Sequence, residues 1–164
     1  MKVFVSGSIS IKSLPLIAKQ KLNNIMNNNL TVLVGDANGI DKIVQEYLSD
    51  NHYNNVVVYY AGNCIRNNIG HWTTENVPSG NLQGRAKYTL KDLRMASDSD
   101  FGLMIWDGLS KGTQNNINEM LNLGKHFYVI RNNEILTDKL FQSKEKEKIL
   151  QNELFTFWLN VNLS

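Results

Sequence analysis

Glycines that follow apolar runs are the residues of this chain best placed for chemistry. Four runs rich in β-branched or aromatic residues end in or beside a glycine, as Ser6-Gly7, Val34-Gly35, Ala61-Gly62 and Asp107-Gly108. Glycine lets the backbone turn sharply and lets a ligand approach the main chain. If the runs are parallel strands, their carboxyl ends share one edge of a sheet, where helix N-termini offer free N–H groups to phosphate. The pattern therefore predicts a site for a phosphorylated ligand.

Two segments at that edge carry suitable donors and acceptors near the N-terminus. In the first, residues 7–10, Gly7 and Ser8 offer backbone amides and a hydroxyl; this is not a P-loop, because Lys12 stands where the second glycine should be. The second, GDANGID at residues 35–41, has Gly35 and Gly39 at the ends of a tight turn and includes Asp36. Asp41 lies in the first helical turn, either as a simple helix-start residue or as an acceptor for ribose hydroxyls.

The third segment, DGLSKGT at residues 107–113, is a flexible loop that opens a helix. Gly108 and Gly112 leave room for a phosphate, and the hydroxyls of Ser110 and Thr113 add donors. Asp107 is a second candidate for reading ribose hydroxyls. These residues complete the predicted cradle.

Residues 61–85 are too long for a mere connector and leave from the same edge. They include Arg66 and Arg85, whose guanidinium groups suit phosphate. We expect Arg66 to close over the ligand phosphate. Trp72 either stacks on a base or pins the loop to the core as a hydrophobic anchor.

The elements that position these segments alternate between strand and helix. Strands are predicted at residues 2–6, 31–34, 56–60, 101–106 and 126–130, with helices at 14–26, 40–48, 86–97 and 112–123. Nearly continuous apolar strands between helices are typical of a parallel sheet covered on both faces. The fold class is therefore α/β, a single Rossmann-like three-layer domain with a mostly parallel sheet of about five strands.

The tail from Glu134 onwards is predicted to be helical, with an apolar cluster between residues 149 and 159. That cluster either packs on the same domain or forms a homodimer interface. We divide the chain into a nucleotide-binding domain at residues 1–130 and a C-terminal helical extension at 131–164.

Composition excludes several classes of protein. The chain has 164 residues, a formal net charge of +2 and one cysteine, and its histidines are scattered without zinc-ligand spacing. We therefore expect no metal and no cofactor. The charge is too small to argue for nucleic acid or a membrane surface, so we expect neither as a partner. With no signal peptide or membrane span in the sequence, we expect a cytoplasmic protein.

Taken together and in order, GSIS (7–10), GDANGID (35–41) and WDGLSKGT (106–113) resemble the SLOG superfamily over residues 1–130. That superfamily includes the DprA proteins, the Lonely-guy phosphoribohydrolases and small YpsA/YspA-like proteins. GDANGID is similar to the turn of the DprA and YspA-like branches, and GLSKGT to the phosphate loop of the Lonely-guy branch. The resemblance implies a Rossmann-like domain that binds a nucleotide or nucleotide-derived ligand.

The chain departs from the Lonely-guy pattern at its hydrolytic pair. Asn116 stands at the position of the glutamate and Lys91 at that of the arginine. An amide cannot act as a general base or offset an oxocarbenium-like cation. Lys91 and Glu119 remain as the candidates for a catalytic role, and turnover stays open.

The main hypothesis is thus a nucleotide-binding sensor or a weak N-glycosidic-bond hydrolase. The alternative is a DprA-like module that binds single-stranded DNA.

Overall fold

Seven strands form one sheet in the order β4-β3-β2-β1-β5-β6-β7 in the computed structural model, which describes residues 1–143. All neighbouring strands are parallel except β6 and β7. The strands are β1 (Lys2–Gly7), β2 (Thr31–Gly35), β3 (Val56–Ala61), β4 (Thr73–Val77), β5 (Phe101–Ile105), β6 (His126–Arg131) and β7 (Glu134–Thr137).

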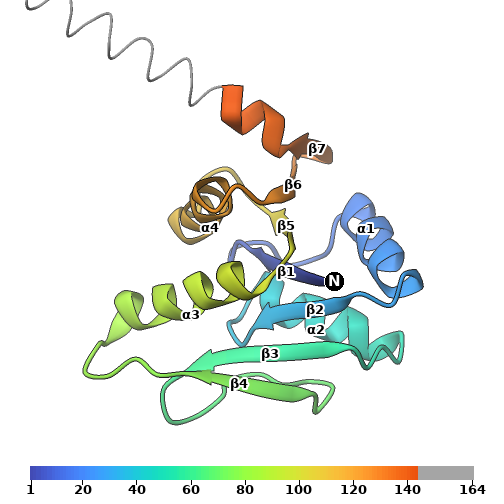
Figure 1. Cartoon of the computed structure of the whole chain (residues 1–164). Coiled ribbons are helices and arrows are strands. Elements are labelled where there is room, and N and C mark those ends of the chain that lie inside the picture. Colours follow the sequence, from blue (N-terminus) through green and yellow to red (C-terminus); the bar gives the residue numbers. More distant parts are fainter. Residues whose placement is uncertain (144–164) are drawn as a thin grey trace, which may run out of the picture.

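Helices cover both faces of this sheet, so the structure has three layers (Figure 1). The helices α1 (Leu16–Asn27) and α2 (Ile40–Asp50) pack on one face, and α3 (Gly84–Asp98) and α4 (Lys111–Asn122) on the other. Alternate residues of β1 serve the two layers: Val3 and Val5 belong to the first core, and Phe4 to the second. Burial on both faces explains why the strands read as continuous apolar runs.

The predicted α/β class and Rossmann-like architecture are confirmed. All five predicted strands and all four predicted helices are present within two residues of their expected ends. Among residues 1–143, no helix combines the length and the apolar character needed to cross a membrane.

One strand, β4, was not predicted. Four of its five residues are exposed and only Val77 is buried, so the segment has no apolar pattern to mark it. It pairs in parallel with β3 at the edge of the sheet, after a return loop at residues 62–72. Trp72 ends this loop, 8% exposed, and its indole N–H donates to the Tyr53 carbonyl at 2.9 Å. Trp72 is therefore an anchor and does not offer a stacking surface to a ligand.

The prediction of a helix from Glu134 is wrong for residues 134–137, which form β7. Asn132 and Asn133 both have positive φ, 51° and 60°, and connect β6 to β7 as an antiparallel hairpin. Two consecutive residues of positive φ are the requirement of a type I′ turn, which asparagine tolerates. Residues 138–143 are helical. The apolar cluster of the tail, with both interpretations given to it, lies outside the described residues.

Candidate functional site

A cavity of about 250 Å³ lies at the carboxyl edge of the sheet, beside β1. The strand order reverses here, since β2, β3 and β4 extend to one side of β1 and β5 and β6 to the other. Open α/β sheets bind ligands at this switch point. The cavity is lined from β1 and its loop (Ser6, Gly7, Ile9), the start of α2 (Ala37, Asp41), the loop after β3 (Arg66), α3 (Arg85, Tyr88, Thr89, Lys91, Asp92) and the start of α4 (Ser110, Gly112, Thr113, Asn116).

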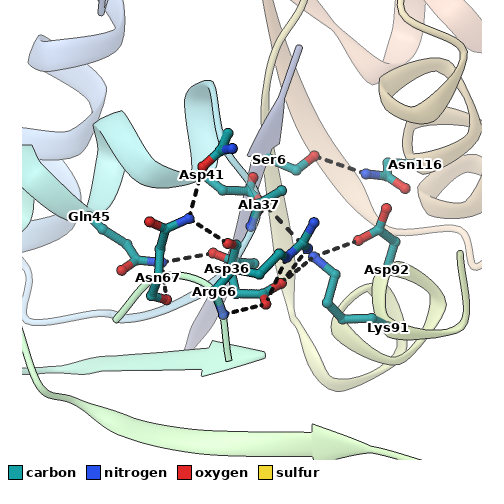
Figure 2. A network of polar contacts seen from close by, with 12 residues as sticks. Ser6, Asp36, Ala37, Asp41, Gln45, Arg66, Asn67, Lys91, Asp92 and Asn116 are labelled. Carbon is teal, nitrogen blue, oxygen red and sulfur yellow. Dashed lines mark hydrogen bonds and ion pairs between the residues drawn. The ribbon is translucent and has the colours of Figure 1, made fainter. Parts of the chain in front are cut away.

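A buried ammonium group forms the floor of the cavity. The Nζ atom of Lys91, a residue 2% exposed, lies 3.3 Å from an oxygen of Asp92, 3.7 Å from one of Asp41 and 3.9 Å from one of Asp36 (Figure 2). Burial alone would lower the pKa of Lys91, but the carboxylates of Asp92, Asp41 and Asp36 raise it overall. The lysine therefore stays charged, as a buried charge with ionic partners does.

Arg66 is held by two neighbours. Its guanidinium group donates to both oxygens of Asp36, at 3.0 and 2.6 Å, and its backbone N–H donates to the same carboxylate. The group also lies over the ring of Tyr88, 4.3 Å from the centroid. Burial raises the pKa of Asp36, but the hydrogen bonds from Arg66 and the charges of Lys91 and Arg66 lower it overall. Asp36 is thus ionised, and its two hydrogen bonds hold the Arg66 guanidinium group in place without a ligand.

Asp41 behaves in the opposite way, although it shares Lys91 with Asp36. Burial raises the pKa of Asp41 to about 6, against the lowering effect of Lys91. The side chain accepts one long hydrogen bond, 3.4 Å, from the Ala37 N–H. It lies in the first turn of α2 and is 7% exposed.

Gly35 makes this cluster of charges sterically feasible. A Cβ atom at this position would lie 2.2 Å from both an Asp41 oxygen and the Lys91 ammonium nitrogen. Any side chain here would separate the two charges. The glycine at the end of β2 therefore leaves the space in which these two charged groups approach each other.

The N-terminus of α4 forms the opposite wall. Ser110 caps the helix, with its Oγ accepting from the Thr113 N–H at 3.4 Å. The Thr113 hydroxyl lies 3.4 Å from the Ser8 hydroxyl across the sheet edge. A Cβ atom on Gly112 would meet only the Ser110 hydroxyl, at 3.9 Å, so the space above this residue is open.

Asp107 organises the loop before α4. One oxygen accepts from the backbone N–H groups of Leu109 and Ser110, at 2.8 and 2.7 Å, and the other from the Ser10 hydroxyl. Burial raises the pKa of Asp107, but these hydrogen bonds lower it overall. Gly108 follows with φ of 83°, directly against the guanidinium group of Arg131.

The predicted site residues divide into three groups. Seven line the cavity: Gly7, Asp41, Arg66, Lys91, Ser110, Gly112 and Thr113. Five lie beside these and contact them through the chain or through hydrogen bonds: Ser8, Gly35, Asp36, Gly39 and Asp107. Two stand apart from the lining: Gly108 and Glu119.

Asn116, the residue at the position of the family's glutamate, does line the cavity. Its amide donates to the Ser6 hydroxyl at 3.1 Å, which in turn donates to the sulfur of Met104. The amide therefore joins α4 to β1 at the cavity floor. Within residues 1–143, no three His, Cys, Asp or Glu side chains gather as they would around a metal ion.

Tyr88 and Asp92 were missed by the sequence reasoning. They stand three and seven residues after Arg85, a spacing that places all three on one side of α3. The sequence signal that could have identified them was their helical spacing from Arg85, which was already a candidate for contacting phosphate.

No protein-family profile matches this chain, and no curated protein sequence does. Among solved structures, the chain is similar to DNA processing protein A from Helicobacter pylori, whose structure is described as giving insight into a unique single-stranded DNA binding mode. The TM-score is 0.62 and the identity 16%, over 95% of this chain and 80% of the other. The likeness supports the Rossmann-like fold and is consistent with the DprA-related fold that the motifs predicted.

The expectation against a nucleic-acid partner is contradicted. The protein of similar fold is described as binding single-stranded DNA. The expectation rested on a net charge of +2, which is an average over the whole chain. The structure gathers Arg66, Arg85 and Lys91 around a single cavity, and a net value does not show where individual cations lie.

Proposed function

We propose that this chain is a SLOG-type protein that binds single-stranded nucleic acid at the carboxyl edge of its sheet. The observation that carries the proposal is the cavity, in which Arg66, Arg85 and the N-terminus of α4 meet. Cationic side chains and a helix N-terminus are the usual partners of a phosphate group. The described activity of the protein of similar fold supports the same class of ligand.

The size of the cavity favours a chain over an isolated nucleotide. Pockets that enclose a whole small molecule usually measure about 300–1,000 Å³, and this one measures about 250 Å³. We therefore place one phosphate of the strand in the cavity, with its base and the neighbouring nucleotides outside. There Tyr88, 36% exposed, offers a base the part of its ring that Arg66 leaves uncovered.

A second candidate is binding of a free nucleotide, with or without slow cleavage of its N-glycosidic bond. It is supported by the carboxylates of Asp41 and Asp92, which reach the cavity where Asn116 offers only an amide. Product analysis after incubation with nucleoside monophosphates tests this candidate.

The test of the main proposal is fluorescence anisotropy with a labelled single-stranded oligonucleotide. Arg85 lines the cavity near the start of α3, and we expect Arg85→Gln to weaken binding about tenfold, the effect of losing one charged hydrogen bond to phosphate.

Arg94→Gln is the matched control, since Arg94 lies on the same helix outside the cavity lining and pairs with Asp98. Equal affinities for Arg85→Gln and the parent protein would remove the cavity from the proposal. Displacement of the oligonucleotide by micromolar free nucleotide would favour the second candidate.

A further inference from the structure

The charges around the cavity balance when every group is ionised. Three cations, Arg66, Arg85 and Lys91, face two lining carboxylates, Asp41 and Asp92, and the Asp36 carboxylate directly behind them. A phosphodiester brings one negative charge to this set, and a terminal phosphomonoester brings up to two. Each added charge is uncompensated unless a carboxylate takes up a proton.

Asp41 is the carboxylate in the best position to take up that proton. It is 7% exposed and lines the cavity, and its nearest cation, Lys91, is shared with two other carboxylates. Asp36 has the two hydrogen bonds of the Arg66 guanidinium in addition. Asp41 has the single Ala37 N–H at 3.4 Å.

We propose that the cavity selects an internal phosphodiester over a terminal phosphate, and that Asp41 enforces this choice by taking up one proton as the phosphate binds. The inference rests on the proposed function and deepens it. A monoanion and one proton leave the balance of the cavity unchanged. When a dianion binds together with one proton, one negative charge has no counterpart in the cavity. The cavity is closed on one side by protein, where an uncompensated charge is costly.

The groups that face Asp41 support this assignment. They are Lys91 and Asp92 from α3, Asp36 from the end of β2 and Arg66 from the loop after β3. Burial raises the pKa of Asp41 to about 6, while that of Asp36 is lowered by Arg66. An incoming negative charge raises the pKa of Asp41 further, so proton uptake falls in the range around neutral pH.

The experiment measures affinity between pH 5.5 and 8 for three probes by calorimetry. These are a short single-stranded oligonucleotide without terminal phosphates, a dinucleoside monophosphate and a nucleoside 5′-monophosphate. The first two probes carry no phosphate group that titrates near neutral pH, so any pH dependence of their affinity comes from the protein. We expect their affinity to fall by up to about tenfold per pH unit above 6, the limit for one proton. At pH 7.5 we expect the dinucleoside monophosphate to bind more tightly than the 5′-monophosphate.

Asp41→Asn keeps the shape of the side chain and removes its titration. This variant should bind the oligonucleotide with little dependence on pH and should lose the preference against the 5′-monophosphate. The control is Glu46→Gln, the same chemical change on the exposed face of α2, where Glu46 pairs with Lys42; it should keep the parent slope. A thermal melt of each variant checks the fold.

Two results overturn the inference while leaving the proposed function intact. One is oligonucleotide binding whose pH dependence is the same in the parent protein and in Asp41→Asn. The other is a parent protein that prefers the 5′-monophosphate at pH 7.5. If no probe binds at any pH, the proposed function fails and the inference fails with it.

Discussion

Two aspartates five residues apart have opposite roles in one charged cluster. Asp36 is held ionised by Arg66, whereas burial raises the pKa of Asp41 to about 6, closer to neutral pH. Both occur in the GDANGID turn, so the sequence correctly placed them together at the sheet edge. It could not distinguish them, because the difference comes from Arg66, thirty residues away in the chain. Environment and not residue type sets which carboxylate titrates.

Tyr88 and Asp92 show a second limit at this scale. Neither belongs to a glycine-rich turn, and α3 has no strongly apolar face that would have oriented it in advance. They become part of the site only because α3 packs across β3 and β2 and beside α4.

Gly112 gives the most direct test of the α4 wall. The position has room for a side chain, so Gly112→Asp should leave the fold intact. A carboxylate there fills the space for phosphate oxygens and repels them, and we expect oligonucleotide affinity to fall tenfold or more. The measurement is anisotropy, with circular dichroism to confirm the fold.

Gly112→Asn is the control for that substitution, since it adds the same volume without the charge. It should bind more tightly than Gly112→Asp. If both variants bind as the parent does, phosphate does not occupy the N-terminus of α4.

At the scale of elements, the loop between β5 and α4 owes its shape to polar contacts within it. The Asp107 carboxylate accepts from two backbone N–H groups and from Ser10, and the Trp106 indole N–H donates to the Ser110 carbonyl at 3.1 Å. These contacts present Ser110 and Gly112 to the cavity. Asp107 therefore positions the cradle from outside.

Asp107→Ala should destabilise the protein by about 1 kcal/mol at pH 7, from the hydrogen bonds lost. The pKa of Asp107 in the folded protein is lowered from its ordinary value of 3.8, so its contribution is present above pH 4 and is lost as the pH falls. The difference in unfolding free energy between parent and variant should therefore shrink below pH 4 in denaturant titrations.

Asp50→Ala, at the exposed end of α2, is the comparison for that variant. A stability difference for Asp107→Ala that is constant from pH 7 to pH 2 would contradict the assignment of its effect to the ionised carboxylate.

A strand could be predicted from the sequence when both of its faces are buried in the protein. The strands β1, β2, β3, β5 and β6 have buried residues on both faces and were recognised from continuous apolar runs. The edge strands were not. In β4 only Val77 is buried, and β7 buries Ile135 and Leu136 only in part. The Asn132-Asn133 turn was the local signal for β7, and an interpretation of the tail as helical concealed it.

At the scale of the whole molecule, the chain has little net charge, and the cations around its cavity are matched by carboxylates. Long-range attraction to a nucleic acid is modest under these conditions, and affinity depends on contacts at one edge. Arg66 is already paired with Asp36, so the exposed cations at that edge that can neutralise phosphates are Arg85 and Lys111, enough for about two phosphates.

The salt dependence of binding should reflect this small number. We expect the logarithm of the association constant to fall against the logarithm of salt concentration with a slope of about −1.5 for a single strand. Anisotropy titrations between 50 and 300 mM salt measure the slope. A slope steeper than about −4 would mean that the nucleic acid contacts a much larger basic surface than this edge.

The central position of β1 has a consequence for how the protein is made. β1 leaves the ribosome before the other strands of the sheet, yet its neighbour β5 begins about a hundred residues later, at Phe101. Until then the β5 side of β1 has no partner, and the contacts that join Ser6 to Asn116 and Ser8 to Thr113 cannot form. Contacts so distant in sequence form slowly. A nascent chain stopped before α4 therefore has its first five strands but no complete binding site, so the site becomes available only after α4 has been synthesised.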